Sequence, residues 1–174
     1  DYYYEFKRQQ VEAMNDVVRV VERVNEEYEA LSGRKYGVLE TFGMEDAEAA
    51  ILCLGSTAGT ARWVARRLRG QGKKIGVVKL WLYRPFPTEK IIETVKGLGA
   101  LVVLDRACSF GAPYGAVCSD IASALRLFEK KLNISNVIYG LGGRDITPSD
   151  IESIFDGALE IAKTGVVKEP VRLM

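Results

Sequence analysis

The chain alternates short runs of apolar residues with longer segments in which apolar residues recur at helical spacing. A short continuous apolar run is typical of a strand that is buried on both faces of a sheet. Recurrence at three- and four-residue intervals predicts helices that bury one side. The expected strands are 36–42, 49–54, 75–83, 100–104 and 136–139, and the expected helices are 4–31, a segment after 55–60 that ends near Gln71, 88–98, 114–131 and one opened by Thr147.

Strands that alternate with helices favour right-handed crossovers, and therefore a mostly parallel sheet with helices on both faces. We predict a three-layer α/β/α fold with about five strands. The last helix has the clearest local signal. Thr147 is expected as its N-cap and Pro148 as its first residue, while Asp150 reaches back to complete a capping box.

The N-terminal helix is unusually long. Its apolar residues follow spacings of three, four and seven, and 28 residues at about 1.5 Å each give a helix of roughly 40 Å. Two interpretations stay open: an arm between domains or subunits, or an amphipathic helix folded onto its own domain. An arm would leave the apolar stripe poorly covered within one chain, and a dimer is then possible. The stripe consists of Val11, Met14, Val18, Val21 and Tyr28.

The predicted organisation is a helical arm at 1–34, an α/β domain at 35–165 and a C-terminal tail at 166–174. Ser32-Gly33 ends the arm, since glycine is common just after a helix. The 174 residues suit one domain with an appendage. The first residues lack Met and a signal-peptide pattern, and we expect a fragment of a longer polypeptide.

Composition narrows the possible chemistry. The net charge of +1 gives no field that would attract nucleic acid or an anionic membrane, and no apolar run approaches a membrane span. The absence of histidine excludes histidine bases, histidine ligands and Ser-His or Cys-His pairs. Cys53, Cys108 and Cys118 show no metal-ligand spacing. We expect reduced thiols and a cytoplasmic location.

Several loops after strands are candidates for a site, because ligands and partners of open α/β sheets gather at the carboxyl ends of strands. The 55–60 turn could hold an anion on its backbone, but it lacks a phosphate-binding fingerprint, and we favour a tight turn capped by Ser56 or Thr57. After 100–104, Arg106 is expected either to grip an anion or partner chain, or to be solvated beside a capping Asp105. Cys108 has no visible activator, so we expect no nucleophilic role.

Two further loops carry arginine. The prolines of 84–87 hold Phe86 in an extended pose, which either staples the next helix or presents Phe86 and Arg84 to a partner. The 140–145 loop has three glycines in four positions, which permit positive φ or close backbone approach. Arg144 can grip a carboxylate or phosphate, or can form a salt bridge between loops.

Three of these strings, at 82–87, 104–111 and 140–148, occur in an order and spacing that resembles the C-terminal part of the alpha subunit of 2-oxoacid:ferredoxin oxidoreductases, such as pyruvate:ferredoxin oxidoreductase. The Gly-Leu-Gly-Gly-Arg-Asp string at 140–145 is the most specific. The resemblance covers about 36–165 and implies a fold similar to the C-terminal domain of transketolase. It implies an enzyme that converts a 2-oxoacid and coenzyme A to acyl-CoA and CO2.

The same resemblance implies thiamine diphosphate with Mg2+, iron–sulfur clusters, ferredoxin as electron acceptor, and partner subunits of beta, gamma and delta type. It places the cofactors on segments outside this chain, so we expect no catalytic residue, metal or cofactor here. Loop residues are instead expected to order the site and the subunit contacts. These are Arg84, Phe86, Asp105, Arg106, Ser109, Phe110, Gly111, Gly142, Gly143, Arg144 and Asp145.

Two alternatives remain at this point. One is the C-terminal domain of another thiamine enzyme, of dehydrogenase E1 or transketolase type, which is not expected to carry the 140–145 string. The other is a flavodoxin-like module that binds an anionic nucleotide or coenzyme A at the loops after Leu54 and Leu104.

Overall fold

A computed structural model describes residues 2–129 and 131–174 of the chain, and one six-stranded sheet organises these residues. The strand order is β1-β3-β2-β4-β5-β6, in which β1 runs antiparallel to β3 and the other neighbours are parallel. The strands are β1 (Leu39–Phe42), β2 (Ala49–Leu54), β3 (Ile75–Leu80), β4 (Ala100–Asp105), β5 (Asn133–Ile138) and β6 (Val171–Leu173).

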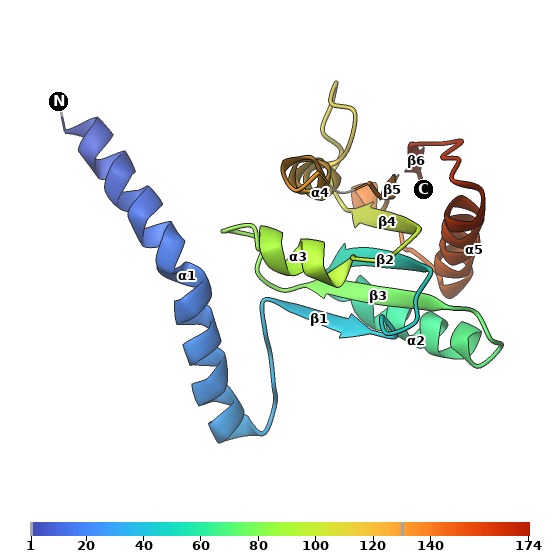
Figure 1. The fold of residues 1–174 in the computed structure, drawn as a ribbon, viewed down its shortest axis with the longest axis horizontal. Helices are drawn as coiled ribbons and strands as arrows, with labels where there is room; N and C mark the ends of the chain where they lie inside the picture. The colour runs from blue at the N-terminus through green and yellow to red at the C-terminus, as the bar shows by residue number, and fades with distance from the viewer. Residues whose placement is uncertain (1, 130) are drawn as a thin grey trace.

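Helices cover both faces of this sheet, which confirms the predicted three-layer α/β/α fold (Figure 1). Apolar side chains of α2 and α5 pack on one face, and those of α3 and α4 pack on the other. Two separate cores result, one on each side of the strands. The helices are α1 (Tyr3–Ser32), α2 (Thr57–Arg69), α3 (Thr88–Thr94), α4 (Ala116–Leu127) and α5 (Pro148–Thr164), with a short 3-10 turn, η1 (Leu141–Gly143).

The predicted C-terminal tail, 166–174, contains the short strand β6, which adds one strand to the about five that were predicted. Gly165 ends α5 in the left-handed conformation, and the chain then returns to the sheet edge. The Asn136 amide donates to the Pro170 carbonyl and the Met174 amide to the Ile138 carbonyl, so β6 pairs with β5. Three residues with an arginine at the centre give too weak a pattern to predict a strand.

Other boundaries shift by a few residues. Strand β3 ends at Leu80 rather than at 83, because the next two amides turn toward the carbonyl of Val38. Strand β5 begins three residues earlier than predicted and carries polar residues that reduced its apolar signal. Helices α3 and α4 are shorter than predicted. The predicted helix 114–131 and the predicted arm 1–34 include Lys130 and Asp1, which lie outside the described residues.

Helix α1 projects from the sheet as a separate rod, joined to β1 by an extended segment (Figure 1). It has no buried residue. It meets the α/β domain in its C-terminal half, where Glu22 pairs with Lys90 and the rings of Tyr28 and Tyr36 lie 5.7 Å apart. The apolar residues of α1 are therefore at most partly buried by the α/β domain. Among the described residues, no helix combines the length and apolar character needed to cross a membrane.

Candidate interface at the carboxyl edge of the sheet

Asp105 is an internal anchor at the end of β4. Its side chain is only 2% exposed. Its carboxylate accepts hydrogen bonds from the amides of Val117 and Cys118, at 2.9 and 3.1 Å, and from the Asn136 side-chain amide at 3.0 Å. It therefore neutralises the free N–H groups and partial positive charge at the start of α4. Gly115 is required beside it, since an added Cβ would lie 2.6 Å from the carboxylate.

Arg106, the next residue, points the other way. It is exposed, and its guanidinium carbon lies 5.9 Å from the centre of the Tyr139 ring. Its Nε would lie only 2.9 Å from a Cβ at Gly140, a contact that this flexible side chain can relieve by moving, and it is the φ of 69° that favours glycine there. Among the described residues it forms no ion pair, and none joins it to Asp145. Its charge is therefore available to a group outside this chain.

Tyr139 supports Arg106 from beneath. Its hydroxyl is 2.7 Å from Oγ1 of Thr57 inside the domain, and burial raises the pKa of the phenol. This contact also corrects the predicted cap of α2: Ser56 makes no side-chain capping bond, and the Thr57 hydroxyl is engaged with Tyr139 instead. The 55–60 turn is thus tied into the domain by a side chain that pattern analysis could not anticipate, because the two residues are 82 positions apart.

The segment between β4 and α4 projects beyond the sheet as a loop (Figure 1). The Ala112 amide donates to the Ser109 carbonyl at 3.0 Å, and Gly111 has φ of 78°. This is a tight turn with glycine where positive φ is needed. Phe110 stands at its tip and is 95% exposed. A fully exposed aromatic side chain on a hydrogen-bonded turn is typical of an anchor for a partner surface.

The 140–145 loop lies beside Arg106 and ends in two exposed charged residues. Gly140, Gly142 and Gly143 have φ of 69°, 63° and 83°, values that favour glycine at each position. The loop forms the turn η1 and then presents Arg144 and Asp145 to solvent. A mostly polar cavity of about 270 Å³ lies next to it. Residues that line it are Tyr139, Arg144, Asp145, Ile146, Asp150, Arg172, Leu173 and Met174.

Arg84 follows the carboxyl end of β3, and its charge is engaged within the domain. Its guanidinium donates to the Asp120 carboxylate at 2.8 Å, and the Tyr83 hydroxyl donates to the same carboxylate at 2.7 Å. The hydrogen bond to Asp120 raises the pKa of Arg84. Phe86 is partly buried, with its ring 6.2 Å from that of Tyr83. The 84–87 turn therefore connects β3 to α3 and α4 by contacts within the domain. This is the first of the two alternatives given for this turn, in which it fixes the next helix.

The structure thus brings Arg106 to the 140–145 loop and leaves Arg84 and Phe86 on the α4 side. Sequence analysis missed several residues that order these loops. Asn136 offered a signal, because it is a polar residue in an apolar strand. The others gave none that a single sequence reveals, since each depends on a partner far along the chain. The missed residues are Gly115, Asp120, Asn136, Tyr139 and Arg172.

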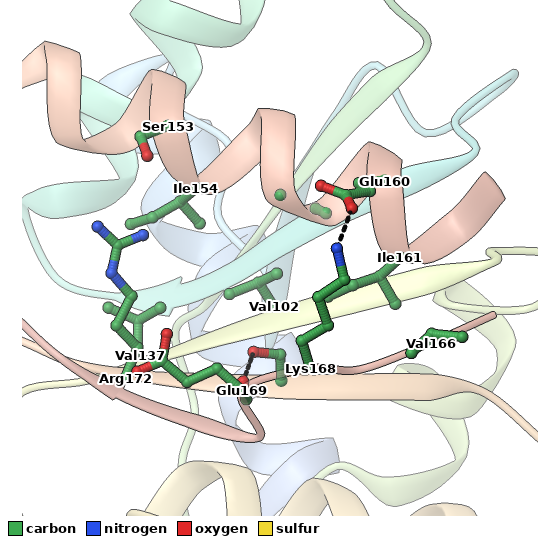
Figure 2. A pocket seen from close by; sticks show the side chains of 13 residues that line it. Val102, Val137, Ser153, Ile154, Glu160, Ile161, Val166, Lys168, Glu169 and Arg172 are labelled. Carbon is green, nitrogen blue, oxygen red and sulfur yellow. Dashed lines mark hydrogen bonds and ion pairs between the residues drawn. The ribbon is translucent and has the colours of Figure 1, made fainter. Parts of the chain in front are cut away.

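A second cavity, of about 230 Å³, lies between α5 and the β5–β6 edge (Figure 2). Its floor is apolar, with Val102, Val137 and Ile154. At its mouth the Lys168 ammonium lies 2.8 Å from the Glu160 carboxylate. This cavity exists because α5 covers the central strands while β6 extends the sheet further, so it could not be predicted before β6 was known.

The cysteines and carboxylates do not fit an iron–sulfur cluster or Mg2+. Within the described residues no group of three or more histidine, cysteine, aspartate or glutamate side chains could hold a metal. Cys53 and Cys118 are buried, and burial raises the pKa of each thiol to about 12. Cys108 is partly buried in the loop after β4.

The fold and its loops define a class: a three-layer α/β domain whose carboxyl edge orders exposed loops without a visible catalytic set among the described residues. Residues 47–151, more than half of the chain, match the family model described as pyruvate:ferredoxin oxidoreductase core domain II. The chain belongs to this family.

Curated relatives agree. The chain is 44% identical to pyruvate synthase subunit PorA of Thermotoga maritima over 159 residues, 91% of this chain and 40% of that protein. It is 38% identical to PorA of Methanothermobacter thermautotrophicus, over 88% of this chain and 39% of that one. Ketoisovalerate oxidoreductase subunit VorA of Pyrococcus abyssi is 32% identical, over 97% and 43%. The chain spans about two fifths of the length of these relatives.

Two solved structures share the fold. One is a 2-oxoglutarate:ferredoxin oxidoreductase from Magnetococcus marinus, with a TM-score of 0.52, 22% identity, and coverage of 80% of this chain and 22% of that one. The other is a split-gene transketolase, with a TM-score of 0.57, 18% identity, and coverage of 74% and 44%. At these identities the likeness concerns the fold alone, and it confirms the expected transketolase-like architecture.

Proposed function

We propose that this chain is part of the alpha subunit of a 2-oxoacid:ferredoxin oxidoreductase, and that its domain orders loops and subunit contacts rather than supplying catalytic groups. The observation that carries the proposal is the 44% identity to a PorA subunit across 91% of the chain. The enzyme would convert a 2-oxoacid and coenzyme A to acyl-CoA and CO2 and pass electrons to ferredoxin. Pyruvate is the proposed substrate, because the relatives that are 44% and 38% identical are pyruvate synthase subunits.

The cofactors of such an enzyme would sit outside this chain. Thiamine diphosphate with Mg2+ supplies an electron sink for decarboxylation, and iron–sulfur clusters carry electrons onward. The described residues offer no ligand set for either metal group. The proposal therefore assigns these groups to other segments and to partner subunits of beta, gamma and delta type. The reduced, mostly buried thiols support a cytoplasmic location.

The carboxyl edge is the proposed contact surface. Phe110 is exposed on a hydrogen-bonded turn, and Arg106 has a charge with no carboxylate partner among the described residues. Buried aromatic and arginine anchors dominate most protein interfaces. Asp105 and Gly115 hold the base of the same loop from inside. This division, with an anchored base and an exposed tip, supports a role in positioning a neighbouring subunit.

Reconstitution tests the proposal. The complete subunit that contains this chain would be purified with its partner subunits and assayed for reduction of ferredoxin that depends on both coenzyme A and a 2-oxoacid. We expect activity with pyruvate that exceeds activity with 2-oxoisovalerate or 2-oxoglutarate, and none from the 174-residue chain alone. An assembled complex that reduces no acceptor with any 2-oxoacid would contradict the proposal.

A further inference from the structure

Helix α1 carries two apolar stripes rather than one. The first is the predicted stripe, which runs through Val11, Val18 and Val21. The second consists of two interleaved series at seven-residue spacing, which place their side chains on one side of a helix of 3.6 residues per turn. Its members are Phe6, Ala13, Val17, Val20, Val24 and Leu31. Together the stripes make about half of the helix circumference apolar, which is typical of a helix with two neighbours.

The middle of the first stripe already has a neighbour. Val18, Val21 and Asn25 are partly buried, and Val21 and Asn25 lie across a groove from Tyr36 and Trp81. The ion pair of Glu22 with Lys90 lies on the same side. The α/β domain therefore covers the middle of the first stripe.

Apart from the partly buried Val17, the second stripe is exposed. Leu31 is 88% exposed, Phe6 59% and Val24 51%, and the three consecutive tyrosines at the far end of the helix are exposed as well. The far end of α1 lies away from the sheet domain (Figure 1). Contiguous apolar surface of this kind is rare on a complete soluble protein and marks a surface that packs against another element.

We propose that the second stripe of α1 packs against the remainder of the subunit polypeptide, the part that a PorA-length protein has and this chain lacks. The match to PorA of Methanosarcina barkeri covers 97% of this chain but only 42% of that protein. The α1 segment thus belongs to the shared sequence, and more than half of the relative remains to cover it. This inference rests on the proposed function, because it takes the chain as part of such a subunit.

Charge argues against a second copy of the chain as the neighbour. Helix α1 has seven acidic and four basic residues, and three of the acidic ones lie in its last third. Two copies packed along this helix would bring like net charge together, which disfavours pairing. A different partner segment avoids this repulsion.

Cysteine footprinting tests the proposal. In a Cys108→Ser background the native thiols left in this chain are buried, so label found on peptides of this chain reports the added cysteine. Val24→Cys probes the second stripe, and Ala30→Cys is the matched control, because Ala30 is exposed on the polar side of the same helix. Maleimide labelling of each is measured in the 174-residue chain and in the complete subunit. We expect equal rates in the chain, and in the complete subunit about a tenfold slower rate at Val24→Cys only.

The sample in which Val24→Cys is protected identifies what covers the second stripe. Protection of Val24→Cys in the complete subunit, when monomeric and without other subunits, supports the proposal. Protection in the 174-residue chain that grows with its concentration would identify a second copy and overturn it. Protection that requires added partner subunits would assign the stripe to a different chain and overturn it too, as would equal labelling throughout. Maleimide labelling does not require enzymatic activity. Failure of the oxidoreductase assay would therefore reject the proposed function, but it would leave the labelling result for the second stripe unchanged.

Discussion

Helices α5 and α1 carry similar amphipathic patterns but meet different environments. In α5 the apolar stripe of Ile151, Ile154 and Phe155 is buried against the sheet, and a capping box begins the helix. In α1 no residue is buried, and Tyr2 at its N-cap makes no side-chain bond. Amphipathic spacing predicts that a helix forms and which side seeks burial. The spacing does not tell whether the surface that covers this side belongs to the same chain segment. A helix of a folded domain is covered within its own chain, whereas an arm is not.

The largest expected effect contrasts the two helices directly. Phe155→Ala should lower the free energy of unfolding of the chain by about 3–5 kcal/mol, because it leaves a cavity in a core that excludes solvent. Val24→Ala on α1 should change it by no more than about 0.5 kcal/mol, since the side chain is half-exposed. Urea unfolding monitored by circular dichroism measures both. An equal decrease in the free energy of unfolding for the two substitutions would contradict this difference between α5 and α1.

A second contrast compares neighbouring residues at the end of β4. Asp105→Ala should destabilise the chain by about 2–3 kcal/mol, because it leaves two buried amides at the start of α4 without their acceptor. Arg106→Ala should cost about 0.5 kcal/mol or less in the chain, since that side chain is exposed.

For the affinity between subunits in the assembled complex, the order should be the reverse: Arg106→Ala should have a larger effect than Asp105→Ala. Arg106→Ala and Phe110→Ala should weaken association, while Leu127→Ala, an exposed apolar residue at the end of α4, serves as the control. Analytical ultracentrifugation of subunit mixtures measures the change. Association that is unaffected by Arg106→Ala and Phe110→Ala would argue against the carboxyl edge as a contact surface.

The smallest effect concerns the helix starts. Thr147→Ala should cost about 1 kcal/mol, because the Thr147 hydroxyl caps the Asp150 amide, whereas Tyr2→Ala should cost nothing measurable. The hydrogen bonds from Thr147 lower the pKa of Asp150. A lowered folded-state pKa stabilises the protein above the unfolded value of about 4, and this contribution is lost as the pH falls through the folded value. The difference between wild type and Thr147→Ala should therefore narrow below about pH 4 in thermal unfolding, and a constant difference would contradict it.

Much of the fold followed from the sequence because its determinants are local. The apolar run at β4, the helical spacing of α5 and the Thr147 capping box each lie within a few residues. Strand β6 was missed, because three residues at a sheet edge become a strand only through pairing with β5. The candidate site was less predictable for the same reason. A capping Asp105 beside a solvated Arg106 was one of two open alternatives, because the choice depends on Asn136 and Tyr139, which are distant in the chain.

The central claim is that this chain is one folded part of a larger subunit whose remainder covers α1. Hydrogen–deuterium exchange tests it most directly. In the isolated chain, amides of α1 should exchange far faster than those of α5, because isolated helices are marginally stable without tertiary packing. In the complete subunit, α1 should gain protection of about a hundredfold or more while α5 changes little. Exchange in α1 that stays equally fast in the complete subunit would contradict the account.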